Sequence, residues 1–499
     1  MTTLHETAFF MIVATANFTP LSGFHQTLCI LHIIGDDLGV TNSGQLVWLM
    51  SGYGLTVGTF ILLAGRLGDV YGYKRIFVLG NLWFAAFTLL AGLSTYAGRE
   101  RRYAVFLVSR ILQGIGPALL IPNAVALLGV TYVPGPRKAM LFALFGAVAP
   151  TSAVVSPAVT SLFAMVWWPA AFWALALVLV IVALSAVHVI PDVPQSPEKT
   201  AADAAAAATL PQQPHGGGFR HFCAELDVLG AVTGVTGLVL ISVAWNQGAV
   251  DGGGWRSAYV WALLGLGVGL CGGFAYVEGR ARKPLIPLRA VNSGVAFVLA
   301  AVFCGWGCFG IYIYYTWEFY EVARGASPLL ATAWHSPILV SGVAAAVTTG
   351  LVIHRVGPAA VMALALLAFT VGTALIATAP VGQTYWAQTF LCNVIVTWGM
   401  DLSFPAATLM LSDLVASEHQ GIAASLVTTV VNYSGALALG VAGTVEARVN
   451  RGGRTPEDVL RGYRGAWYVA VGLGAVGLAI SLAFAWRFSK WQRATTTAG

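Results

Sequence analysis

The chain has 499 residues, of which 58% are hydrophobic and only 9% are charged. An ordinary globular chain carries about 25% charged residues, so this one has too few to cover a water-soluble surface. Its abundant apolar residues also exclude a disordered chain. The net charge of +6 comes from basic residues that stand mostly singly or in pairs between apolar runs. That arrangement indicates membrane topology and not nucleic-acid binding, so the composition predicts a membrane protein with many spans.

Each helical crossing of a bilayer needs about 20 apolar residues. The sequence contains fourteen such runs, near residues 8–33, 45–65, 76–95, 104–130, 139–165, 168–190, 228–246, 256–278, 291–317, 328–353, 358–379, 384–411, 420–444 and 466–486. An even number of crossings puts both chain ends on one side. The basic loops after the second, fourth and eighth runs predict that this side is cytosolic. We expect a multi-pass protein of the cell membrane, and the vacuolar membrane is the alternative.

The segment between the second and third runs, from Gly65 to Arg75, is short, basic and rich in glycine. Gly65 and Gly72 allow a tight turn and a close approach of two helices. Asp69 is placed to cap a helix start or to pair with an arginine across the loop. Lys74 and Arg75 anchor the cytosolic face.

The fourth run carries a charge inside the membrane. Arg110 and Gln113 are three residues apart and therefore share one face of the helix, and Gly114 and Gly116 follow them. A charged side chain within a span costs about 2.5–3.5 kcal/mol or more, so it normally faces a cavity or a partner. The alternative is a structural arginine that bonds to carbonyl groups of neighbouring helices.

These two stretches resemble motifs of the major facilitator superfamily, Gly-x-Leu-x-Asp-x-x-Gly-x-Lys/Arg in the loop and Arg-x-x-Gln-Gly-x-Gly in the fourth span. Fourteen spans narrow the resemblance to the drug:proton antiporter branch. Other stretches resemble a fungal subgroup that includes aminotriazole- and boron-resistance pumps and a low-affinity ammonium transporter. They are residues 31–35, 226–230, 245–248, 284–288, 398–405, 432–434 and 440–446.

The resemblance implies an all-α integral membrane protein with the major facilitator fold. Residues 1–191 are then an N-terminal half of six helices, and 192–226 are a cytosolic linker, whose proline, alanine and glycine content is typical of a flexible tether. Residues 227–289 are an inserted central pair of helices. Residues 290–499 are a C-terminal half of six helices with a short cytosolic tail.

The resemblance also implies secondary transport by alternating access. It assigns gating to the loop residues Gly65, Asp69, Gly72, Lys74 and Arg75. One departure concerns the fifth span, where the antiporter branch has a Gly-Pro-x-x-Gly-Gly core. Residues 146–158 keep small residues and prolines but lack the paired glycines, which weakens the inference of export.

Few ionisable residues are expected deep in the membrane. Asp401 lies near the middle of the twelfth run, and the resemblance places it across the central cavity from Arg110. A carboxyl group in a low-dielectric site is suited to exchange protons. We predict that Asp401 and Arg110 couple transport to protons; the alternative for Asp401 is an acid that serves helix packing.

The predicted residues of the substrate cavity are His25, Gln113, Tyr312, Tyr315, Glu318 and Asn432. The aromatic residues of the ninth run either line a site for planar or apolar compounds or form a belt at the membrane surface. Asn432 supplies an amide for hydrogen bonding.

The absence of a phosphate-binding loop argues against an ATP-driven pump, and no catalytic or metal-binding cluster stands out in the sequence. We therefore expect no enzyme activity and no cofactor. The expected partners are a small-molecule substrate, protons and the lipid bilayer, without nucleic acid, and the chain is expected to be monomeric. The leading hypothesis is a proton-coupled efflux pump for toxic compounds or a secondary metabolite. The alternatives are uptake of a small polar solute, such as ammonium or borate, and a non-transporting sensor.

Overall fold

Long apolar helices form the computed structural model, which describes residues 3–40, 42–133, 135–191, 227–248, 254–281, 284–286, 292–415 and 420–496. Fourteen helices in these ranges are long and apolar enough to cross a membrane, and no strand occurs in them. Helices suit a bilayer because each one satisfies its own backbone hydrogen bonds. The predicted all-α class with fourteen spans is confirmed. The predicted linker, 192–226, lies outside the described residues.

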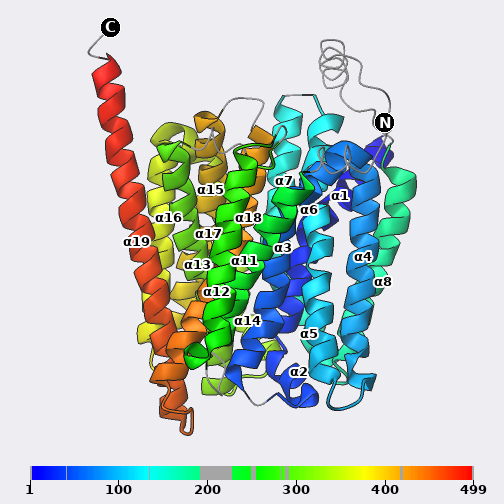
Figure 1. The fold of residues 1–499 in the computed structure, drawn as a ribbon, viewed down its shortest axis with the longest axis vertical. Coiled ribbons are helices and arrows are strands. Elements are labelled where there is room, and N and C mark those ends of the chain that lie inside the picture. The colour runs from blue at the N-terminus through cyan, green and yellow to red at the C-terminus, as the bar shows by residue number, and fades with distance from the viewer. Residues whose placement is uncertain are drawn as a thin grey trace.

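Both chain ends lie at one end of the bundle (Figure 1), as an even number of crossings requires. We call this end the termini face and the other end, which carries α2, the α2 face. The first eight helices form the N-terminal group. They are α1 (Thr3–Leu28), α2 (Leu31–Leu38), α3 (Ser43–Tyr71), α4 (Tyr73–Leu93), α5 (Arg102–Gln113), α6 (Ile115–Thr131), α7 (Pro136–Ala164) and α8 (Pro169–Val189).

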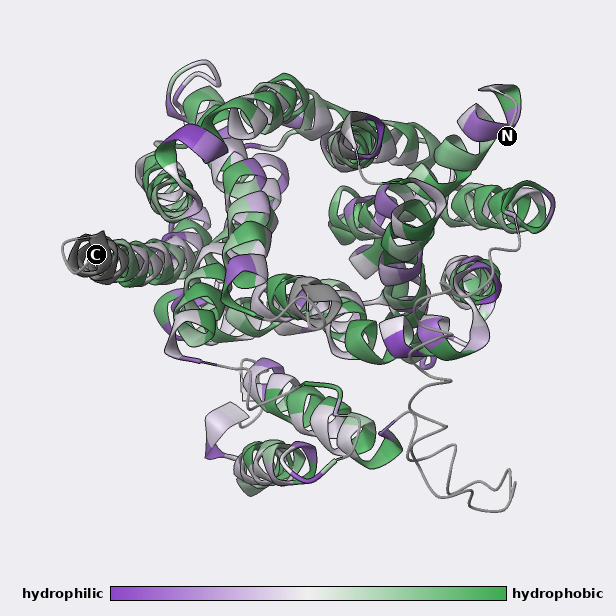
Figure 2. Cartoon of the chain, turned by 90° about the horizontal axis from the view of Figure 1, so that it is seen from above, coloured by the Kyte–Doolittle hydropathy of each residue, from purple (hydrophilic) through white to green (hydrophobic). Residues whose placement is uncertain are grey.

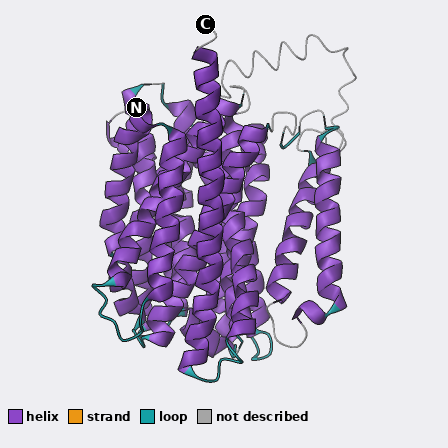
Figure 3. Cartoon of the chain, turned by 90° about the vertical axis from the view of Figure 1, so that its left-hand side faces the viewer, coloured by secondary structure: helices purple, strands orange, loops and turns teal. Residues whose placement is uncertain are grey.

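Two helices, α11 (Val228–Gly248) and α12 (Ala258–Glu278), stand as a pair beside the other helices (Figures 2 and 3). Of the two, α11 packs against α3 and α18, and α12 packs on α11. The remaining helices form the C-terminal group. They are α13 (Ser293–Glu318), α14 (Pro328–His335), α15 (Pro337–Val356), α16 (Pro358–Thr378), α17 (Gln388–Leu414), α18 (Gln420–Val449) and α19 (Pro456–Thr496).

Three of the predicted spans are interrupted. The first, predicted near 8–33, ends as α1 at Leu28, and α2 begins at Leu31. The fourth is divided at Gly114 into α5 and α6, and the tenth is divided at Ser336 into α14 and α15. Pro337 begins α15; since proline has no backbone N–H, it suits the first position of a helix and not its interior. Gly114 allows close packing, because a Cβ atom there would lie 2.5 Å from the Tyr53 carbonyl oxygen.

Helix α18 is joined closely to helices on both sides through glycines. A Cβ atom at Gly310 of α13 would lie 2.7 Å from the Cα atom of Gly435, and one at Gly58 of α3 would lie 2.8 Å from the backbone nitrogen of Tyr433. Small residues allow helix backbones to approach in this way within a membrane. Through α18, the N-terminal group is therefore packed directly against the C-terminal group.

The two groups also meet toward the α2 face. A large hydrophobic cluster extends there and includes residues 28–31 of the N-terminal group and Ile311 of the C-terminal group. Between α7 and α15, a Cβ atom at Gly342 would touch Pro150 at 3.0 Å, whereas Cβ atoms at Gly146 and Gly350, nearer the termini face, would meet nothing within 4 Å. Along these two helices the contact is therefore closed near the middle of the membrane and open toward the termini face.

Candidate functional site

Arg110 lies in the interior of the N-terminal group, with no exposed surface. Its Nη1 donates to the Gly23 carbonyl oxygen of α1 at 3.0 Å, and its Nε donates to the Leu49 carbonyl oxygen of α3 at 3.3 Å. The guanidinium lies over the ring of Tyr53, 4.4 Å from its centroid, in a favourable cation–π position. Its Nη2 is buried without a hydrogen-bond partner. The cation therefore ties α1 and α3 to α5 and keeps one donor unused.

Gln113 completes this arrangement from the next turn of α5. Its side-chain oxygen accepts from Arg110, and its amide nitrogen donates to the Thr88 hydroxyl of α4 at 2.6 Å. Gln113 is fully buried, so both ends of its amide serve contacts among N-terminal helices. That it faces the substrate stays a prediction.

The segment predicted as a glycine-rich loop is instead helical: α3 continues to Tyr71, and Gly72 alone separates it from α4. It runs close to α6, because a Cβ atom at Gly68 would clash with Asn123 Oδ1, so that position admits no side chain without movement. Gly72 links α3 to α4 with a φ of +92°, a conformation that favours glycine. Tyr73 donates its hydroxyl hydrogen to Asp69 Oδ1 at 2.7 Å.

The other predicted gating residues lie near this loop. A Cβ atom at Gly65 would touch Pro122 at 3.7 Å and Ser425 of α18 at 3.9 Å, so the end of α3 adjoins the C-terminal group. Lys74 and Arg75 stand in the first turn of α4 at the termini face. Gating by the loop stays a prediction.

Asp401 lies midway along α17. Its Oδ2 is buried and has no hydrogen-bond partner. The same oxygen would lie 3.0 Å from a Cβ atom at Gly342 of α15, and Pro150 of α7 would lie equally close to that atom. The carboxyl group is thus next to the point where the two groups meet.

Arg110 and Asp401 are not partners in this structure. The hydrogen bonds of Arg110 go to α1, α3 and its own helix, while the Asp401 carboxyl group lies beside Gly342 of α15. The predicted coupling between the two residues would therefore act through the helices, not through a direct ion pair.

Tyr312 and Tyr315 are fully buried inside the C-terminal group. The Tyr312 hydroxyl donates to Asn393 Oδ1 of α17 at 2.6 Å, and the Tyr315 hydroxyl donates to Glu446 Oε2 of α18 at 2.8 Å. Their hydroxyl groups thus bind neighbouring helices in this conformation, and their predicted contact with substrate stays untested. Asn432 of α18 is half-buried and donates to its own helix, at the Thr428 carbonyl oxygen.

His25 and His335 are buried histidines, one in each group. His25 of α1 lies 2.8 Å from the Leu21 carbonyl oxygen through its Nδ1, and His335 is the last residue of α14. His335 stacks on Trp317 with ring centroids 4.9 Å apart. Both ring nitrogens of His335 are buried without a partner, so this residue is an additional candidate that the sequence did not single out.

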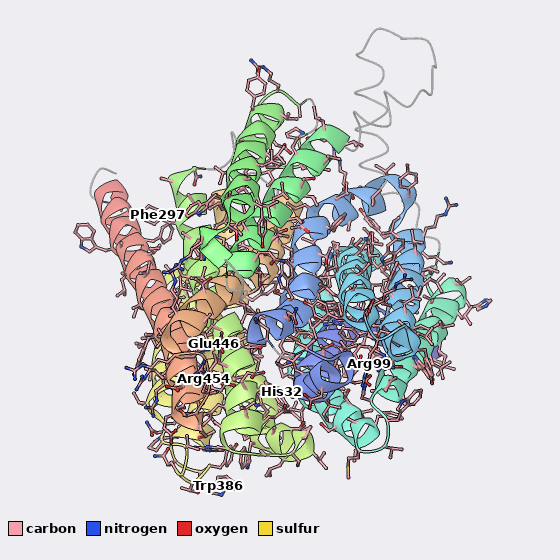
Figure 4. The ribbon with its side chains drawn as sticks, turned by 60° about the horizontal axis from the view of Figure 1, so that its bottom comes forward. His32, Arg99, Phe297, Trp386, Glu446 and Arg454 are labelled. Atoms are coloured by element: carbon pink, nitrogen blue, oxygen red, sulfur yellow. The ribbon has the colours of Figure 1, made fainter. Side chains whose placement is uncertain are left out.

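Glu318 forms an ion pair between the two groups. His32 Nε2 of α2 lies 3.0 Å from each carboxylate oxygen of Glu318, at the end of α13. Tyr463 of α19 donates its hydroxyl hydrogen to the same carboxylate at 3.1 Å. Figure 4 shows His32 between the helices of the two groups. This ion pair joins the two groups at the α2 face.

The surroundings of His32 favour its charged form. Burial alone disfavours the imidazolium, but the negative charges of Glu318, Glu321 and Asp36 and the bond to Glu318 outweigh this effect and raise the pKa of His32 to about 9. Sequence reasoning did not select His32, although it lies in one of the stretches that carry the resemblance. A histidine at the very end of the first predicted run was its only signal, because its partner is far along the chain.

Comparisons with known proteins show which family the whole chain resembles. The family model described as Major Facilitator Superfamily matches residues 8–439. The chain is 48% identical to a protein of Saccharomyces cerevisiae named low affinity ammonium transporter, over 97% of this chain and 89% of that protein. It is 40% identical to the efflux pump terJ of Aspergillus terreus, over 96% of this chain and 88% of the pump.

The fold is similar to that of solved transporters. The crystal structure of the peptide transporter POT in complex with sulfate superimposes with a TM-score of 0.60, over 95% of this chain and 94% of that one, at 17% identity. Because the family model covers most of the chain and the relatives align along nearly all of it, the chain belongs to the major facilitator superfamily and is a transporter.

Proposed function

We propose that this transporter exports small toxic compounds or metabolites in exchange for protons. The similarity to a relative named an efflux pump, at 40% identity, supports export as the direction of transport. The observation that supports proton coupling is the carboxyl group of Asp401. Its buried Oδ2 has no hydrogen-bond partner and lies next to the contact between the groups. An uncompensated charge in such a place is costly. A proton removes that cost when it binds and restores it when it leaves.

Alternating access would supply the mechanism. In this proposal the termini face is cytosolic, and the chain works as a monomer in the cell membrane. The closed contact at the α2 face and the open spacing at Gly146 and Gly350 then correspond to a conformation that faces inward. Opening to the outside requires His32 and Glu318 to separate, and Asp401 would change its surroundings as α7 and α15 move.

Uptake of a small polar cation is the second candidate. The relative at 48% identity is named a low affinity ammonium transporter, and the fifth span of this chain lacks the paired glycines of the antiporter branch. The same fold and the same partnerless carboxyl group serve either direction, because a cation can replace the proton at Asp401.

A growth assay separates the two candidates. The chain is expressed in yeast that lacks its own pumps, and growth is measured with aminotriazole, borate, azoles, aromatic mycotoxins and methylammonium. Export predicts resistance to at least one compound, and a protonophore should abolish that resistance. Sensitivity to methylammonium without resistance to any compound would contradict export and favour uptake.

The ion pair at the α2 face predicts a pH dependence of closure. When the pair separates, the pKa of His32 returns toward its ordinary value of about 6.5, whereas in the closed form it is about 9. The pair therefore stabilises closure fully below about pH 6.5, and this stabilisation is lost as the pH rises through about 9. In His32→Gln, the α2 face should open more often at pH 7 but behave like the parent well above pH 9.

The buried thiol of Cys29, between α1 and α2, can report this opening. Its labelling rate by a maleimide is measured in a chain whose other cysteines are replaced. At each pH the rate in the variant is divided by the rate in the parent, because this ratio cancels the effect of thiol ionisation. The two pKa values of His32 correspond to a ratio of up to about 80-fold at pH 7, and the ratio should approach one at high pH. His188→Gln, an exposed histidine of α8, is the control. A ratio that does not change with pH would contradict the role of the pair.

A further inference from the structure

An open groove of about 630 Å³ runs between the ends of α18 and α19 at the α2 face. It is unrelated to the contact between the two groups of helices. The residues that line it are Val445, Val449, Arg461, Arg464, Gly465, Tyr468 and Val469. Its walls are therefore mainly apolar, with two cations at one end.

The two arginines share one face of α19, because their positions are three residues apart. Arg461 is exposed and Arg464 is half-buried, and Arg464 Nε is buried without a hydrogen-bond partner. The ion pairs found among the described residues involve other side chains, and neither arginine has a further contact of this kind. Two guanidinium groups thus face the groove without an acidic partner.

The groove faces the lipid side of the helices. Tyr468 is 58% exposed and lies one turn further along α19 than Arg464, so tyrosine and arginine mark the level where headgroups meet acyl chains. Gly465 forms part of the floor, where a Cβ atom would lie 3.4 Å from Val445. The absence of a side chain at this position keeps the groove open between the arginines and the valines.

We propose that this α18–α19 groove binds one phospholipid molecule, with its phosphate on Arg461 and Arg464 and an acyl chain along the valines. Arginine binds phosphate oxygens in a paired geometry that lysine does not match. Basic pockets between membrane helices bind lipid headgroups for the same reason. A free phosphate ion would contact only the arginines, and an uncharged lipid would contact only the valines. The groove therefore favours a molecule that has both a phosphate group and an acyl chain. The site does not depend on the transported solute.

Native mass spectrometry of the full chain in detergent tests this proposal. The probes are phosphatidylglycerol, diacylglycerol with the same acyl chains, and inorganic phosphate. The double variant R461Q/R464Q is compared with R451Q/R454Q, whose arginines are exposed in the preceding loop. We expect phosphatidylglycerol to bind the parent and R451Q/R454Q at least tenfold more tightly than R461Q/R464Q, and diacylglycerol to bind weakly to all three.

A second variant keeps the proposal testable if R461Q/R464Q does not fold. Gly465→Leu retains both arginines but fills the groove, and it should also lose bound phosphatidylglycerol by at least tenfold. Equal binding in all variants would overturn the proposal, as would equal loss in R451Q/R454Q, which would indicate a general charge effect. Equal affinity of the parent for diacylglycerol and phosphatidylglycerol would show that the phosphate does not contribute to binding. Full displacement of the lipid by inorganic phosphate at millimolar concentration would indicate an ion site.

Discussion

Replacement of Asp401 by asparagine is expected to abolish gradient-driven accumulation of substrate while leaving the fold intact. With one proton per substrate, each pH unit across the membrane supports about a tenfold accumulation ratio, since tenfold corresponds to about 1.4 kcal/mol. The amide of asparagine is nearly the size of the carboxyl group but does not bind and release a proton. The ratio in Asp401→Asn should therefore fall from about tenfold to about one.

The measurement uses purified transporter in lipid vesicles with an imposed gradient of one pH unit. Exchange of labelled for unlabelled substrate at equal pH is measured in the same vesicles, and it should continue in Asp401→Asn, because exchange needs no net proton movement. Asp413→Asn is the matched control, since Asp413 lies on the same helix but is exposed. Full accumulation by Asp401→Asn would disprove proton coupling at this residue, and loss of exchange as well would indicate a structural acid.

Arg110→Lys is expected to lower transport at least tenfold, although the positive charge is kept. The guanidinium reaches the carbonyl oxygens of Gly23 and Leu49 and the side chain of Gln113 at once. The single ammonium group of lysine does not reproduce this planar fork. Each charge-assisted hydrogen bond that is lost costs about 1.5–3 kcal/mol, so α1 and α3 would no longer be held together as firmly when the transporter changes conformation.

Transport per folded molecule and the melting temperature are measured together for Arg110→Lys and Arg110→Ala. Both variants should melt at a lower temperature than the parent, and the alanine variant should melt lowest. Arg101→Ala, which removes an exposed arginine directly before α5, should change neither quantity. Normal transport in Arg110→Lys would show that the charge alone matters and that the bridge between α1 and α3 does not.

Individual residues show how far the sequence predicts this site. The loop motif is local, so its glycines could be interpreted directly: Gly72 has the positive φ expected of a tight turn. The closest approach, however, involves Gly68 and Asn123, which are far apart in the chain. Similarly, Arg110 and Gln113 were identified by their spacing of three residues, but only the packing of α1, α3 and α4 around them revealed their partners.

Composition and apolar run length were sufficient to determine a helical membrane protein with fourteen spans, because the bilayer imposes one length and one type of secondary structure on each crossing. Local motifs were sufficient to indicate a transporter family. Tertiary structure alone decided which polar residues pair across the two groups, such as His32 with Glu318. It also decided that Tyr312 and Tyr315 bind neighbouring helices in this conformation. These pairings depend on how each helix is rotated and where it crosses its neighbours, and nearly uniform apolar sequences specify neither.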